Sequence, residues 1–123
     1  MPGLFDVLLE MHPDVIEIRL YYASYLTALE QFDDAVKQYE FILDNIDSKN
    51  VQSWGGIIDI KLQQNNPEDL ANVTNKAILN LPEYPQWYLY QSIAYTQLKR
   101  NDDAINSLEK GLPLIMIQAF SFV

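Results

Sequence analysis

The 123-residue sequence contains no cysteine and a single histidine. The absence of cysteine excludes disulfides, thiolate nucleophiles and cysteine-based zinc sites. His12 stands beside Pro13 in an expected turn, where a lone histidine is usually solvated, so we expect it neither to catalyse a reaction nor to bind a metal. With only 4 Gly and 6 Pro, the chain is also poor in the residues that a sandwich or barrel needs for its many tight turns. These shortages favour helices.

Long apolar runs and basic clusters are missing as well. No segment reaches the roughly 18 apolar residues that a membrane-spanning helix needs, and Asp6 and Glu10 interrupt an N-terminal stretch that lacks the basic residues of a signal peptide. Lys and Arg number 8 against 17 Asp and Glu, which gives a net charge of -9. This charge repels phosphate backbones and anionic lipids. We therefore expect a soluble chain that neither binds nucleic acid nor inserts into a membrane. The sequence leaves its compartment open: cytoplasmic or, if the chain is a fragment of an exported bacterial protein, periplasmic.

The acidic balance has two interpretations that the sequence leaves open. Solvated helix faces are often rich in Asp and Glu, and a basic partner is the alternative.

Hydrophobic residues make up 49% of the chain and aromatic residues 12%, which is enough for a hydrophobic core in about one domain.

The sequence repeats itself with a period of roughly 34 residues. Residues 19–43 match residues 88–112 without gaps at nine of 25 positions, with an offset of 69. A third copy is expected between them, and residues 51–81 contain a matching pattern around a break at Asn65, Asn66 and Pro67. Apolar residues recur at helical spacing inside each copy. Each copy is therefore predicted to be an antiparallel pair of helices joined by a tight turn.

Acidic and capping residues recur where the second helix of each copy should begin. Asn66 is a good N-cap, Pro67 suits the first helical position, and Asp69 stands where the acid of a capping box would. The carboxylate pairs Asp33–Asp34 and Asp102–Asp103 occupy the same repeat position. Paired carboxylates could indicate a metal, but their recurrence favours an interaction with the helix N-terminus.

The three copies resemble the tetratricopeptide repeat, a helix pair of about 34 residues with small and aromatic residues at fixed positions. In the last copy the matching residues are Tyr88, Ser92, Tyr95, Ala104, Leu108 and Gly111. In the first copy they are Ala23, Leu26, Ala35 and Tyr39, whereas Arg19 departs from the pattern. The middle copy supplies Trp54, Ala77 and Pro82, and departs at Ile58, Lys61 and Leu70, which leaves open a small slip in the alignment there.

The resemblance implies an all-α fold, a right-handed α-α superhelix of antiparallel helix pairs. A half repeat would occupy residues 1–15, and full repeats would occupy about 16–50, 51–84 and 85–112. Because the chain starts inside a repeat, we expect it to be a fragment of a longer array. Small residues such as Ala35 and Ala104 are expected where paired helices cross closely.

In this family the first helix of each pair lines a concave groove that binds protein segments. The resemblance therefore implies groove positions in all three copies. The candidates are Glu17, Leu20, Tyr21, Ser24, Thr27, Gln52, Asp59, Gln86, Leu89, Tyr90, Ile93, Thr96 and Gln97. None is Lys, Arg or Asn, so the grip on a terminal carboxylate that some family members use is not carried over. The alternative is that these tyrosines and leucines only pack between neighbouring repeats.

Residues 113–123 form a hydrophobic C-terminal tail without any charge. We expect Gly111 and Pro113 to end the last helix, so that the tail folds back and caps the last repeat. Self-association through this tail is the alternative, and it would make the chain a homo-oligomer. The closing Ser121, Phe122 and Val123 also fit, weakly, a ligand recognised by its terminal carboxylate.

Together these patterns predict a protein-interaction scaffold that binds a peptide or partner helix in its groove. The alternative is a structural or homo-oligomerising module within a longer repeat chain, without its own peptide ligand. We expect no catalytic residue, no cofactor and no metal, because the sequence contains no phosphate-binding loop, nucleophile elbow or zinc-ligand spacing.

Overall fold

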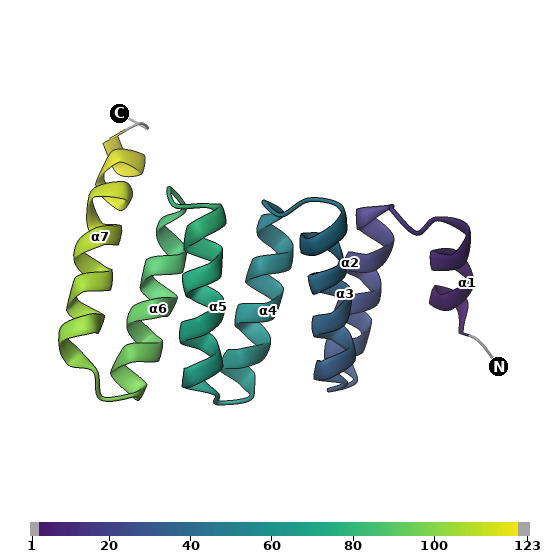
Figure 1. The fold of residues 1–123 in the computed structure, drawn as a ribbon, viewed down its shortest axis with the longest axis horizontal. Coiled ribbons are helices and arrows are strands. Elements are labelled where there is room, and N and C mark those ends of the chain that lie inside the picture. The colour runs from purple at the N-terminus through teal and green to yellow at the C-terminus, as the bar shows by residue number, and fades with distance from the viewer. Residues whose placement is uncertain (1–2, 121–123) are drawn as a thin grey trace. The chain divides into compact units, whose positions relative to one another are not determined.

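The computed structural model describes residues 3–120, and over that range the chain consists of seven α-helices joined by short turns, with no strand (Figure 1). The all-α class is therefore confirmed. In chain order the helices are α1 (Leu4–Met11), α2 (Ile16–Ala28), α3 (Phe32–Asn45), α4 (Val51–Gln63), α5 (Pro67–Asn80), α6 (Pro85–Gln97) and α7 (Asn101–Phe120).

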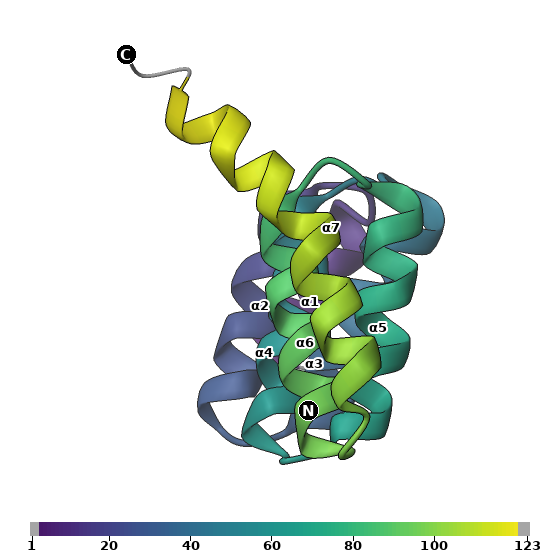
Figure 2. The same ribbon diagram turned by 90° about the vertical axis from the view of Figure 1, so that its left-hand side faces the viewer.

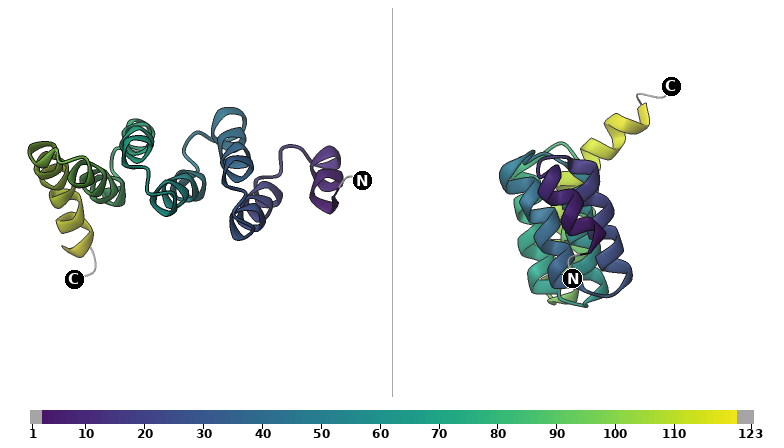
Figure 3. Two further views of the ribbon diagram at one scale, coloured as in Figure 1. Left: turned by 90° about the horizontal axis from the view of Figure 1, so that it is seen from below. Right: turned by 90° about the vertical axis from the view of Figure 1, so that its right-hand side faces the viewer.

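The chain divides into two compact units. Unit 1 covers Met1–Ile60 and unit 2 covers Lys61–Val123. The division falls near the end of α4, so most of that helix belongs to unit 1. In unit 1, α2 lies side by side with α3 and α1 packs on α2, and in unit 2, α6 contacts both α5 and α7 (Figure 3).

The helices follow the predicted repeat spacing. The first helices of the three copies begin at Ile16, Val51 and Pro85, and the second helices begin at Phe32, Pro67 and Asn101. In both series the successive starts are separated by about 34 residues, as expected of this repeat. In the pairs α2–α3 and α6–α7 the connection is only a few residues long, which makes the two helices of each pair antiparallel.

Each of the three turns inside a helix pair contains a non-glycine residue in the left-handed conformation. These residues are Glu30, Asn65 and Lys99, with φ of 59°, 52° and 61°. In the first turn the Glu30 N–H donates to the Thr27 carbonyl (2.9 Å), and the Gln31 N–H donates to the Leu26 carbonyl (2.9 Å). This bond pair is the Schellman motif, which satisfies carbonyls at the end of a helix. The other two turns repeat it, although the sequence offered no glycine to predict it.

The starts of the second helices match the capping predictions. The Asn66 side chain accepts a hydrogen bond from the Asp69 N–H (3.2 Å), and Pro67 occupies the first turn of α5. The Asp69 carboxylate accepts from the Asn66 amide (3.0 Å) and lies 3.4 Å from the Lys61 ammonium group. Asp33 and Asp34 lie in the first turn of α3, and Asp102 and Asp103 lie in that of α7.

The core of unit 1 lies between α2 and α3. Ala23 and Ala35 are both fully buried, as expected of small residues at a close crossing. Helix α1 packs on α2 through aromatic side chains, because the ring of Phe5 stacks on the ring of Tyr22 with the two ring centroids 4.8 Å apart. Trp54, in α4, is 7% exposed, and its indole N–H donates to the Ser48 carbonyl (2.9 Å).

The core of unit 2 combines apolar packing with a buried network of hydrogen-bonded polar side chains. Trp87 is 2% exposed, and its indole nitrogen has no hydrogen-bond partner among the described residues. Gln91 of α6 joins its neighbours on both sides, because its amide donates to Asn75 of α5 and its carbonyl oxygen accepts from the Ser107 hydroxyl of α7 (2.7 Å). A satisfied network of this kind fixes how the three helices pair.

The end of α7 differs from the prediction. Gly111 and Pro113 do not end the helix, which continues to Phe120 and extends past the ends of α5 and α6 (Figure 2). A Cβ atom on Gly111 would lie 2.8 Å from the Cβ atom of Tyr88, so this glycine allows α7 to approach α6 closely. The expected fold-back of the tail is therefore wrong as far as residue 120. Ser121, Phe122 and Val123 lie outside the described residues.

Candidate functional site

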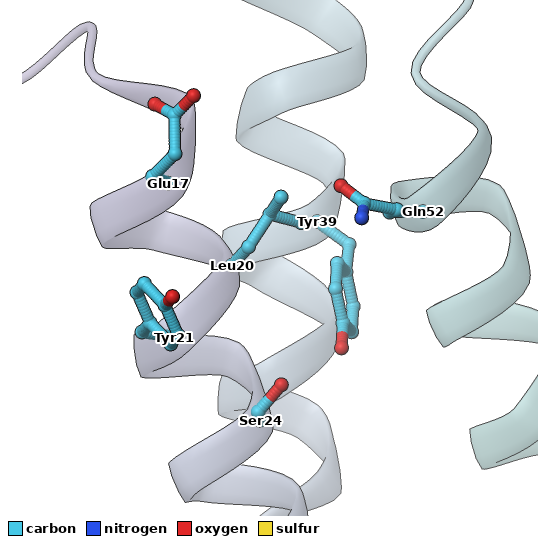
Figure 4. A pocket seen from close by; sticks show the side chains of 6 residues that line it. All are labelled: Glu17, Leu20, Tyr21, Ser24, Tyr39 and Gln52. Atoms are coloured by element: carbon cyan, nitrogen blue, oxygen red, sulfur yellow. The ribbon is translucent and has the colours of Figure 1, made fainter.

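A groove opens on unit 1 between α2, α3 and the start of α4. It has a volume of about 440 Å³ and is lined by Glu17, Leu20, Tyr21, Ser24, Tyr39 and Gln52 (Figure 4). We call it the unit 1 groove. Five of these six residues are among the predicted groove positions, and the sixth, Tyr39, was predicted only as a residue that matches the repeat pattern.

The helical period explains why α2 presents four of the lining residues together. Leu20, Tyr21 and Ser24 follow Glu17 by three, four and seven residues, which places them on one face of the helix. The opposite face carries the buried residues Arg19, Ala23 and Leu26. Packing of that face against its neighbours therefore leaves the first face open.

Tyr39 reaches the groove from α3 and lies against the backbone of α4. Its side chain is 7% exposed. A Cβ atom on Gly56 would lie 2.6 Å from the Tyr39 Cε2 atom and 2.7 Å from its hydroxyl oxygen, so only glycine leaves room for the ring. At Gly55, one residue earlier, a Cβ atom would meet nothing within 4 Å. The sequence signal for this contact is the Gly55–Gly56 pair inside a helix, which local propensity does not explain.

Burial raises the pKa of the Tyr39 phenol above its usual value. Hydrogen bonding with Ser24 and Thr27 acts in the opposite direction, and the negative charge of Asp59 raises the pKa further. Tyr39 is therefore a neutral phenol at physiological pH, able both to donate and to accept a hydrogen bond. Three predicted groove positions, Ser24, Thr27 and Asp59, thus act on one side chain.

Tyr21 is exposed rather than buried. Its side chain is 71% exposed, so it is not part of the core of unit 1. Glu17, Ser24, Gln52 and Asp59 are also exposed, while Leu20 and Thr27 are half-buried. The Thr27 hydroxyl donates to the Ala23 carbonyl (2.8 Å) and so continues the hydrogen bonding of its own helix.

The predicted positions in the last copy all lie on α6 of unit 2. Leu89 is 48% exposed and Tyr90 and Ile93 are half-buried, whereas Gln86, Thr96 and Gln97 are exposed. In the alignment of the first copy with the last, the counterpart of Tyr39 is Leu108, which is 49% exposed. Unit 2 therefore does not reproduce the buried tyrosine of the unit 1 groove.

The described residues offer no second candidate site of the kinds considered from the sequence. Within residues 3–120 no group of three or more His, Asp and Glu side chains is arranged to hold a metal ion. His12 is exposed at the end of α1, where its backbone N–H bonds to the Leu8 carbonyl. None of the described helices is both long and apolar enough to cross a membrane.

Comparison with known proteins supports the predicted fold. Neither a protein-family model nor a curated protein matches the sequence. The crystal structure of MamA, a tetratricopeptide-like protein, superposes with a TM-score of 0.71 over 89% of this chain, at 15% sequence identity. The match spans 64% of the MamA chain. At this identity the likeness concerns the fold, and it confirms the predicted tetratricopeptide-like stack of helix pairs.

Proposed function

We propose that this chain is a tetratricopeptide-repeat module that binds an extended segment of a partner protein in the unit 1 groove, and that it is not an enzyme. The observation that carries this proposal is the convergence of six side chains from three helices on one open groove. The lining includes an exposed aromatic ring, that of Tyr21, and a buried one, that of Tyr39.

The lining suits an extended peptide because it combines apolar area with hydrogen-bonding groups. Leu20 and the two tyrosine rings offer surface that a side chain of the ligand can cover, and aromatic residues lose little conformational entropy on binding. Ser24 and Gln52 carry donors and acceptors that can pair with a peptide backbone. Such groups have to be paired when a ligand displaces water, so they fix its position.

The repeat assignment is part of the same proposal. We assign the half repeat to residues 1–15 and the full repeats to about 16–50, 51–84 and 85–112. The first helix of the last copy, α6, would offer further binding surface through a set of exposed or half-buried positions, namely Gln86, Leu89, Tyr90, Ile93, Thr96 and Gln97.

Tyr21→Ala is expected to weaken peptide binding by roughly 30-fold, because truncating a central aromatic anchor typically costs about 2 kcal/mol or more. Peptides would be selected from a random display library on the whole chain, and their dissociation constants measured by fluorescence anisotropy. Tyr25→Ala is the control, since this tyrosine is 53% exposed on the same helix but does not line the groove. Equal affinities of the two variants would contradict the proposed site.

A second candidate function is self-association, and it is favoured by an apolar stripe on α7. Ile105, Leu108, Leu112 and Ile115 are each about half exposed, between 49% and 54%, and their spacing puts them on one face of the helix. One repeat earlier, the counterparts of the first two are Ala71 and Thr74 of α5, which are 6% and 0% exposed. The same repeat position is therefore buried on α5 and open on α7.

If α7 joins two copies, the double variant Leu112→Ser with Ile115→Ser should convert a dimer into a monomer. The reason is that a paired helix face loses its hydrophobic contacts when two central apolar residues become polar. Light scattering measures the mass of both proteins, and circular dichroism checks that the variant keeps its helices. A wild-type chain that is already monomeric would exclude this second function and leave the groove proposal in place.

A further inference from the structure

The net charge of the chain is concentrated in unit 1. Residues 1–60 contain 11 Asp and Glu against 3 Lys and Arg, a formal charge of -8. Residues 61–123 contain 6 Asp and Glu against 5 Lys and Arg, a formal charge of -1. The unit 1 groove thus belongs to the acidic part of the chain, and the surrounding field attracts cations.

The basic residues of unit 1 do not line the groove. The Arg19 guanidinium is held by the Pro13 carbonyl and the Gln38 side chain, each at 2.9 Å. The Lys37 ammonium lies 3.9 Å from a carboxylate oxygen of Asp34, and Lys49 lies in the turn after α3. The groove lining therefore contains one formal charge, the carboxylate of Glu17.

Glu17 stands at one end of the groove on an exposed turn of α2 (Figure 4). Among residues 3–120 the ion pairs join Lys37 to Asp34, Lys61 to Asp69 and Arg100 to Asp103, and none engages Glu17. One helical turn further on lies Tyr21, whose ring is exposed. A cation at this end of the groove would therefore have a carboxylate and an exposed aromatic ring within one helical turn of each other, and both attract cations.

We propose that the unit 1 groove selects peptides by a lysine or arginine side chain, whose charged end pairs with Glu17. This inference rests on the proposed function, and it names the class of ligand for that site. The aliphatic part of the side chain lies along Leu20 and the tyrosine rings, in the way that long basic side chains cover apolar surface while their charge stays near water. The charge of unit 1 adds a faster encounter with a basic partner.

The last copy provides a natural contrast. In the alignment of the first copy with the last, Glu17 corresponds to Gln86, so the chain itself contains the uncharged version of this position. Glu17→Gln therefore changes the charge while keeping the length and shape of the side chain. The variant should fold normally because Glu17 is exposed and makes no tertiary hydrogen bond or ion pair in the described part of the chain.

The test starts from peptides selected by the whole chain in a random display library at low salt. We expect the selected peptides to be enriched in Lys or Arg at one position. One such peptide and a copy with norleucine or citrulline at that position are then titrated into the wild type and into Glu17→Gln. We expect Glu17→Gln to weaken binding of the basic peptide by about five-fold and to leave the neutral peptide unchanged, because only the charge pair is removed.

The matched control is Glu40→Gln, which removes the same charge from an exposed position of unit 1 outside the groove lining. In titrations at ordinary salt this control is expected to change affinity less than two-fold, since Glu40 is exposed, does not line the groove and is screened by salt. A general attraction to the acidic unit would weaken the basic peptide equally in both variants, and the inference would then be wrong.

The result also separates the two proposals. Peptides that depend on Tyr21 but show no basic enrichment, or bind Glu17→Gln and the wild type equally, would overturn the lysine or arginine preference and keep the groove. A library that yields no peptide dependent on Tyr21 would overturn the proposed function and with it this inference.

Discussion

Gly56→Ala is expected to lower the free energy of unfolding by about 1–2 kcal/mol, because the added methyl group overpacks a buried contact. This methyl group would lie within 2.7 Å of the Tyr39 hydroxyl oxygen, so the buried ring has to leave its place against α4. Overpacking of this kind costs roughly 1–3 kcal/mol, and the better helix propensity of alanine offsets up to about 1 kcal/mol of it. Urea denaturation followed by circular dichroism measures the difference.

Gly55→Ala is the matched control, because a Cβ atom at Gly55 meets no atom within 4 Å. The same exchange in the same helix should therefore stabilise the protein by about 0.5–1 kcal/mol through propensity alone. A Gly56→Ala variant as stable as Gly55→Ala would show that Tyr39 does not lie against α4. It would also remove the reason for placing Tyr39 in the groove.

Arg19→Met should destabilise the protein by about 2–3 kcal/mol, because it removes a charged donor from two part-buried acceptors. Arg19 is 8% exposed, and it donates from Nε to the Pro13 carbonyl and from Nη1 to the Gln38 side chain, both at 2.9 Å. Its guanidinium carbon also lies 3.5 Å from the centre of the Phe41 ring. Methionine keeps much of the apolar volume but makes neither hydrogen bond, and bonds to charged groups contribute roughly 1.5–3 kcal/mol.

Arg100→Met serves as the comparison. Arg100 also donates to an acceptor, Asp103 at 2.8 Å, and also lies over an aromatic ring, that of Tyr95 at 4.7 Å. Its side chain is 55% exposed, however, so we expect a loss of about 0.5 kcal/mol or less. Thermal or urea unfolding of the two variants side by side checks the difference, and equal effects would contradict the structural role of Arg19.

The elements of this fold were predictable because their signals are local and repeated. The match of residues 19–43 to residues 88–112 predicted helices at a fixed spacing, and the observed helix starts recur at that spacing in both series. The Asn66 cap and the acid pairs were predictable for the same reason, since each acts within one turn of its own position.

The missed features depend on contacts between helices. Arg19 looked like a departure from the repeat pattern, yet its side chain is buried against α3. There it donates a hydrogen bond to Gln38 and lies over the ring of Phe41, and both residues are distant from it in the sequence. Gly111 looked like a helix end, although its role is to let α7 approach Tyr88 of α6. Local sequence cannot separate these roles, because the same glycine signal indicates a cap or a close crossing.

The candidate site was predicted in part. The family resemblance pointed to the face of α2 that lines the unit 1 groove, and it also pointed to Gln52 on α4. Tyr39 was missed because its repeat position is usually a core position, and it does stay buried while its ring forms part of the groove lining. The positions on α6 stay predictions.

The chain contains two tryptophans, and one lies in each unit: Trp54 in unit 1 and Trp87 in unit 2. Both are buried, but the Trp54 indole N–H is bonded to the Ser48 carbonyl, whereas that of Trp87 has no partner among the described residues. The two indole rings thus differ in the polarity of their surroundings, and this polarity determines the wavelength of maximum tryptophan fluorescence. In variants that keep only one of the two tryptophans, intrinsic fluorescence therefore reports on unit 1 or on unit 2 separately. Repeat arrays can lose their structure in stages, and here the order of loss can be followed without attaching a dye.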